Sequence, residues 1–327
     1  MSTDPKKTAT GVPEGEEWRT YDGQRTVYDP SLSSDALKAA REGIERHRKG
    51  PCVLQVLARD GQPLANHPVR LEQLGHSFLF GEQLWPLDAM YRDGEQETEK
   101  ARAWKRRFCE VFNAATNLCY WTERFRNDAS KTEEFQGEPR VENFAQTVDW
   151  CLANGLTAKG HPLFWSIAKC TPDWVKRYDL ETQMKFAEVR VRNLVARFKG
   201  RVKLWDATNE ALWEPAPKNL PKRDWPHIES IADMVEYIAP VLRWCREEDP
   251  EARFIINDYG TENEPAGKRP NCPKDNSPVT AERQRKRHLE LAKALIQTGQ
   301  SPDGIGLQSH TGWVRDHSEQ TAVYDEY

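Results

Sequence analysis

An asparagine and a glutamate stand side by side after an apolar run near the middle of the chain. Asn209 and Glu210 follow residues 202–205, which are predicted to form a short strand. Cleavage of a glycosidic bond needs two carboxyl groups, one as an acid and one as a nucleophile or base. Glu210 is the best candidate for the acid. The amide of Asn209 could bind a sugar 2-hydroxyl, a contact that strengthens in the transition state.

Histidine, glutamine and tryptophan side chains follow other predicted strands. If those strands are parallel and form a barrel, their carboxyl ends meet at one rim, where such barrels place their active sites. Aromatic rings stack on the apolar faces of sugars, and amides bind hydroxyls. The candidate substrate-binding residues are Asn209, His161, Trp165, Gln308, His310 and Trp121.

Each candidate also has a plainer interpretation. Taken alone, Glu210 could be a solvated loop glutamate. His161 and His310 could be buried histidines satisfied by backbone groups, although two histidines at strand ends favour a site. Trp165 could equally be a core residue, and Gln308 could pair only with backbone.

The elements that would carry these residues alternate between strand and helix. Six short apolar strands are predicted, separated by helices, and this order indicates a parallel sheet covered on both faces. The fold class is therefore α/β, a TIM (β/α)8-type barrel with about six of its eight strands present. The predicted strands are 78–80, 112–115, 156–159, 202–205, 254–256 and 304–307.

The N-terminal part of the chain has a different pattern. Residues 1–33 are polar and predict a disordered or loosely attached arm. Residues 34–76 predict a helix and then a β-hairpin extension, with alternating runs at 52–57 and 69–74 and a turn signal between them at Asp60 and Gly61. The barrel is expected to occupy residues 77–327.

Composition excludes several classes of function. The chain has 327 residues, 38% apolar and 30% charged, with a formal net charge of -4, so no nucleic-acid partner is expected. No apolar stretch approaches a membrane span, and no secretory leader is visible, so no membrane partner is expected and the compartment stays open. The seven cysteines form no C-x-x-C pair and predict free thiols. No ligand spacing around His161 supports a metal.

Four motifs together resemble glycoside hydrolase family 10, the endo-β-1,4-xylanase family. Residues 205–212, W-D-A-T-N-E-A-L, resemble the family's W-D-V-V-N-E-A-L. Residues 160–165 are similar to its G-H-x-L-x-W, residues 256–259 to its I-N-D-Y, and residues 304–310 to its G-I-G-x-Q-x-H. The motifs occur in the family's order, and the resemblance covers roughly residues 50–315.

The resemblance implies a TIM barrel that hydrolyses β-1,4-xylan with retention of configuration and uses no redox cofactor. It implies that Glu210 is the general acid/base and that His310 hydrogen-bonds the nucleophile. The residues that it places around the cleaved sugar are Asn209, His161, Trp165 and Gln308.

The sequence also departs from the family pattern. The family's nucleophile is a glutamate in a later T-E-x-D motif after an apolar strand. Neither Glu319 nor Glu326 follows such a strand, so no nucleophile is assigned. Residues 117–121 lack the family's lysine, and Ser166 replaces its second histidine. These differences predict a divergent member that stops before the seventh strand, with unpaired strand edges that favour aggregation or partial unfolding.

The expected function is that of a retaining endo-β-1,4-glycanase, xylanase-like, acting on a plant cell-wall polysaccharide. The alternatives are a non-catalytic carbohydrate-binding pseudoenzyme and a truncated gene product. By the resemblance, the site of action would be extracellular.

Overall fold

The computed structural model describes residues 17–19, 25–27, 34–122, 130–133, 136–214, 216–219, 230–262, 271–272, 276–309 and 317–327. The chain divides into two compact units. The larger unit spans Phe78–His310, and the smaller one joins Met1–Ser77 to Thr311–Tyr327. The candidate site lies in the larger unit, and the two units are described separately.

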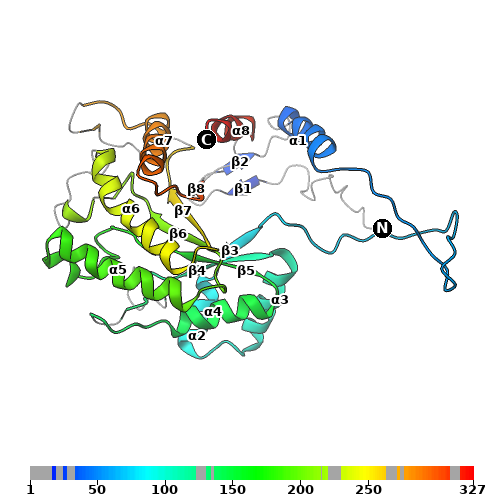
Figure 1. The fold of residues 1–327 in the computed structure, drawn as a ribbon, viewed down its shortest axis with the longest axis horizontal. Coiled ribbons are helices and arrows are strands. Elements are labelled where there is room, and N and C mark those ends of the chain that lie inside the picture. Colours follow the sequence, from blue (N-terminus) through cyan, green and yellow to red (C-terminus); the bar gives the residue numbers. More distant parts are fainter. Residues whose placement is uncertain are drawn as a thin grey trace. The chain divides into compact units, whose positions relative to one another are not determined.

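A six-stranded parallel sheet forms the centre of the larger unit (Figure 1). Each strand pairs with the next one along the chain, in the order β3-β4-β5-β6-β7-β8. This is the arrangement of a partial TIM barrel and confirms the predicted fold class. The strands are β3 (Gly81–Gln83), β4 (Ala114–Leu118), β5 (Thr157–His161), β6 (Leu204–Asn209), β7 (Arg253–Asp258) and β8 (Gly304–Leu307).

Helices connect the strands in the expected alternation. Several begin at a side chain that accepts a backbone N–H of the first turn, as Thr98, Asp179 and Thr280 do. Ser230 and Asp233 form a reciprocal capping box. The helices are α2 (Trp85–Asp93), α3 (Glu99–Val111), α4 (Glu142–Ala153), α5 (Leu180–Arg197), α6 (Ile231–Glu248) and α7 (Ala281–Gln297), with short 3-10 turns at Val175–Arg177 and Pro217–Asn219.

Burial is greatest in the middle of the sheet. The residues of β4 and β6 are almost all buried, whereas those of β3 are exposed and those of β8 are half-buried. β3 and β8 are the edge strands of the described sheet. Among the described residues, no helix is long and apolar enough to cross a membrane.

Trp205 in β6 packs directly against the backbone of β5. The indole is fully buried, and a Cβ added to Gly160 would lie 2.1 Å from its Cε3 atom. Only a glycine therefore lets the two strands approach around this ring. This explains the glycine of the G-H-P-L-F-W segment by packing rather than by chemistry.

Gly160→Ala is expected to lower the free energy of unfolding by about 1–3 kcal/mol, because the added methyl group overpacks a closed core. Urea unfolding followed by circular dichroism measures this change. Gly43→Ala is the matched control, since nothing lies within 4 Å of the added Cβ at that helical position. Equal stability of Gly160→Ala and wild type would contradict the packing argument.

The smaller unit differs from its prediction in two places. The expected arm, residues 1–33, contains an antiparallel pair, β1 (Glu17–Arg19) with β2 (Arg25–Val27). The predicted helix forms as α1 (Ser34–His47), and α8 (His317–Asp325) belongs to the same unit.

The predicted hairpin over 52–57 and 69–74 is wrong in extent. Its turn forms, with Gly61 at φ 81° and its N–H donating to the Ala58 carbonyl at 3.0 Å. Only one bridge follows, between Leu57 and Pro63, and neither predicted strand forms. Val53 is 94% exposed, so the ladder lacks the apolar packing that an isolated two-stranded hairpin needs.

Candidate active site

The end of β6 presents the predicted acid at a backbone turn. Asn209 is the last residue of β6 and is buried, and Glu210 follows it with φ 58°. The N–H of Glu210 donates to the Asn257 carbonyl at 2.7 Å, and the N–H of Asn209 donates to the Phe164 carbonyl at 3.0 Å. Hydrogen bonds to β7 and to the segment after β5 thus fix the backbone around Glu210, which lies in the left-handed region that a non-glycine residue rarely adopts.

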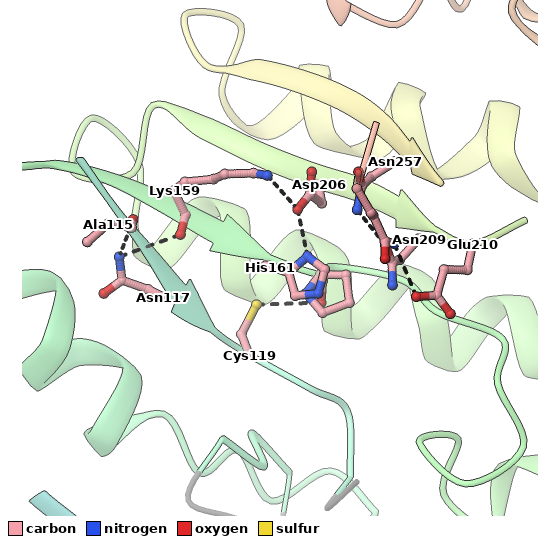
Figure 2. Close-up of polar contacts among 11 residues, drawn as sticks. Ala115, Asn117, Cys119, Lys159, His161, Asp206, Asn209, Glu210 and Asn257 are labelled. Carbon is pink, nitrogen blue, oxygen red and sulfur yellow. Dashed lines mark hydrogen bonds and ion pairs between the residues drawn. The ribbon is translucent and has the colours of Figure 1, made fainter. Parts of the chain in front are cut away.

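An amide cluster fixes the side chains of this pair. Gln308 Nε2 donates to Glu210 Oε1 at 3.1 Å and to Asn209 Oδ1 at 3.2 Å. Asn257 Nδ2 donates to the same Asn209 oxygen at 2.8 Å. Because that oxygen is occupied, Asn209 presents its amide N–H groups as donors. Figure 2 shows Asn209, Glu210 and Asn257 gathered at the ends of β6 and β7.

His161 takes part in a second cluster, with a buried carboxylate. Asp206 is fully buried, and its Oδ2 atom lies 2.6 Å from His161 Nδ1 and 2.9 Å from Lys159 Nζ (Figure 2). Burial favours the neutral acid, but Lys159 and His161 outweigh it and hold the pKa of Asp206 below its ordinary value. A charged carboxylate only accepts hydrogen bonds, so Nδ1 of His161 carries a proton and Nε2 is left for a ligand.

The Tyr120 ring lies between His161 and Trp165. The Tyr120 ring is 5.9 Å from the His161 ring and 5.7 Å from Trp165. Both Tyr120 and Trp165 are buried, in a small cluster with Leu118 and Cys170. Trp165 therefore packs as a core residue in this structure, and Tyr120 is its link to the histidine.

Trp121 lies apart from these clusters. It belongs to the main hydrophobic core, where its indole N–H donates to Glu133 and its ring lies 5.6 Å from the Arg190 guanidinium carbon. The structure thus gathers Asn209, Glu210 and Gln308 in one contact array. His310 lies outside the described residues.

A further carboxyl group supports the loop that follows Glu210. Asp258, at the end of β7, is fully buried and accepts the backbone N–H groups of Leu212 and Tyr259 at 2.8 and 2.9 Å. Burial raises the pKa of Asp258 well above its ordinary value, and the nearby Glu210 raises it further. Asp258 therefore fixes the backbone at Leu212, after Glu210, and at Tyr259, after β7.

The candidate residues did not include four members of these clusters, Lys159, Asp206, Tyr120 and Asn257, although Asp206 and Asn257 belong to the motifs at residues 205–212 and 256–259. One signal was available for Lys159, since residues two apart on a strand share a face and His161 is two residues on. In the part of the chain that the structure describes, no group of three or more His, Cys, Asp or Glu side chains could hold a metal ion.

Comparisons with known proteins show what this chain is similar to. A β-1,4-xylanase of Dictyoglomus thermophilum is 29% identical over 183 residues, 55% of this chain and 45% of that protein. An anti-sigma-I factor of Acetivibrio thermocellus is 23% identical over 300 residues, 91% of this chain and 33% of that protein. The chain thus spans less than half the length of these relatives. A GH10 structure from Paenibacillus barcinonensis, 20% identical, shares the fold with a TM-score of 0.55, over 76% of this chain and 65% of that chain.

A further match is to a family rather than to a single protein. The profile described as "Glycosyl hydrolase family 10" matches residues 110–324, which hold five of the six strands of the sheet and all the clusters described above. The chain is a divergent member of glycosyl hydrolase family 10.

Proposed function

We propose that this chain carries the acid/base side of a retaining endo-β-1,4-glycanase site and that its substrate is xylan or a related β-1,4-glycan. The observation that carries the proposal is the contact of Gln308 with both Asn209 and Glu210 at the strand ends. This array holds one of the two carboxyl groups that cleavage of a sugar bond requires, beside amide donors that can bind a hydroxyl. Because xylan is an extracellular polymer, the proposed work takes place outside the cell.

In the proposed reaction, Glu210 first protonates the leaving glycosidic oxygen and then takes a proton from the attacking water. The amide N–H groups of Asn209 bind the sugar 2-hydroxyl, and Nε2 of His161 binds another hydroxyl of the same ring. A second carboxylate, about 5–5.5 Å from Glu210, must attack the anomeric carbon. We assign no residue among those described to that second role.

One observation favours a second candidate function, that of a non-catalytic glycan-binding protein. The carboxyl group of Asp258 interacts electrostatically with Glu210, yet it is fully buried and accepts two backbone N–H groups, so it is not available to attack a sugar. Without an attacking carboxylate, the amides and His161 could still bind xylan.

Titration calorimetry with xylohexaose, paired with a reducing-sugar assay, tests the proposal on the full chain. Binding with product release supports the hydrolase, binding without product supports the glycan-binding function, and no binding rejects both.

Gln308→Ala is expected to weaken xylohexaose binding by about tenfold, because Asn209 and Glu210 lose the donor that orients them. Gln297→Ala is the matched control, since Gln297 is an exposed amide at the end of α7. The same titration measures both variants. Equal affinities would show that the amide cluster does not face the glycan.

A further inference from the structure

A pocket of about 330 Å³ lies between residues 132–133 and 136–141 on one side and α5 on the other. Its volume is at the lower end of the range for small-ligand sites. Asn209, Glu210, Gln308 and His161 are not among the residues that line it, so it is separate from the candidate active site. The lining residues used below are Glu133, Gln136, Trp174, Phe186, Val189 and Asn193.

One side of this pocket is aromatic and apolar. Trp174 is half-buried, and its ring meets Phe186 edge-on at 4.9 Å between centroids. Phe186, Val189 and Asn193 are spaced at three and four residues, so they share one face of α5. Val189 is 66% exposed, and this side of α5 therefore offers an uncovered apolar surface next to a tryptophan ring.

The other side is polar and partly fixed. The carboxylate of Glu133 accepts the N–H of Gly137 at 2.7 Å and the indole N–H of Trp121, so its position is set. The side-chain amides of Gln136 and Asn193 are exposed and make no hydrogen bond with another described residue. Each amide offers two donors and an acceptor. Hydrogen-bond donors and acceptors thus lie beside the apolar surface of the pocket.

The charges around the pocket argue against an anionic ligand. Arg190 borders the pocket, but it is only 7% exposed, and it donates to three oxygens, those of Leu163, Thr132 and Cys119. Glu133 places a negative charge in the lining, which repels an anion. A wholly apolar ligand would cover the amides of Gln136 and Asn193 without forming hydrogen bonds to them, and their lost hydration would weaken its binding.

We propose that this pocket is a second binding site for a neutral sugar unit. A pyranose ring has an apolar face that stacks on Trp174 and hydroxyl groups that pair with Glu133, Gln136 and Asn193. The choice of a β-1,4-linked xylose unit rests on the proposed function. A second site would hold the polysaccharide to the protein independently of the site at Glu210.

Titration of the full chain with xylohexaose tests this site, with the stoichiometry and both affinities measured. Asn193→Ala is expected to weaken one of two binding events by about 5- to 10-fold and to leave the other unchanged. Trp174→Ala is expected to act on the same event. Asn193 is exposed on a helix, so its variant keeps the test valid even if the tryptophan variant unfolds.

The control is Arg197→Ala, an exposed residue of α5 outside the pocket, which should change neither event. A single binding event that Gln308→Ala weakens and Asn193→Ala does not would overturn the second site and leave the proposed function standing. A single event that only Asn193→Ala weakens would support the pocket and reject the proposed function. Absence of any binding would reject both.

Discussion

Replacing Glu210, the proposed general acid/base, by glutamine is expected to lower kcat on xylan by about 10²- to 10⁴-fold, the usual contribution of such a group. Glutamine keeps an oxygen that can accept the N–H of Gln308, as Glu210 Oε1 does at 3.1 Å, so the array should survive. It cannot supply a proton to the leaving oxygen. Xylohexaose binding should therefore change by less than about threefold, well under the effect on turnover.

Steady-state kinetics on xylan and calorimetry on the same preparation separate these two effects. Glu181→Gln is the matched control, because Glu181 is an exposed residue of α5 that pairs with Lys185 on the surface. Unchanged turnover in Glu210→Gln would remove Glu210 from the mechanism. A loss of binding as large as the loss of turnover would mean that Glu210 only holds the sugar.

Replacing Asp206 by asparagine is expected to cost about 3 kcal/mol of stability at neutral pH, the lower end of the range for breaking a buried ion pair. The lower end applies because the Lys159 side chain is 25% exposed, so water partly solvates the ammonium group that loses its partner. Asparagine keeps only one uncharged oxygen for both His161 and Lys159, so the proton on His161 Nδ1 is held less firmly and sugar binding should weaken as well.

The pH dependence gives the sharper test. The pKa of Asp206 is lowered in the folded chain, so its stabilisation is complete above the pKa of an unfolded aspartate, about 4, and is lost as the pH falls through the lower, folded value. The difference in unfolding free energy between wild type and Asp206→Asn should be largest at pH 7 and shrink below about pH 4. Urea unfolding at several pH values measures it.

Asp149→Asn is the control for this comparison. Asp149 pairs with Arg201 at the surface and is 66% exposed, so its loss should cost less than about 1 kcal/mol. If the wild type and Asp206→Asn differed more at pH 3 than at pH 7, the carboxylate of Asp206 would not be the stabilising form.

The fold could be predicted from the sequence because alternating apolar runs and amphipathic helices leave few topologies open. The strand boundaries were less accurate. β5 and β6 run on to His161 and Asn209, past the apolar runs that ended at Lys159 and Trp205. A barrel strand can carry polar side chains at its carboxyl end, facing the site, and apolar content does not mark that end. His161 and Asn209, which were expected after their strands, are in fact the last members of those strands.

Some members of the candidate site could be named from the sequence, but their contacts could not. Glu210, Asn209 and Gln308 were named from their types and positions, and the structure brings them together. Tryptophan placement could not be read from the sequence, because Trp121 and Trp165 follow strands yet both are buried. A sequence gives the side chain but not which neighbour covers it.

The backbone conformation of Glu210 lowers the stability of the fold at a position where the proposed reaction needs a carboxyl group. A non-glycine residue held at φ 58° lowers the free energy of unfolding by about 1–2 kcal/mol relative to a glycine at the same position. Mutation toward glycine would thus be favoured by thermostability selection and rejected by selection for glycan turnover. In a lineage that no longer depends on this activity, position 210 should be among the first to drift, so its identity in natural variants records whether catalysis is still under selection.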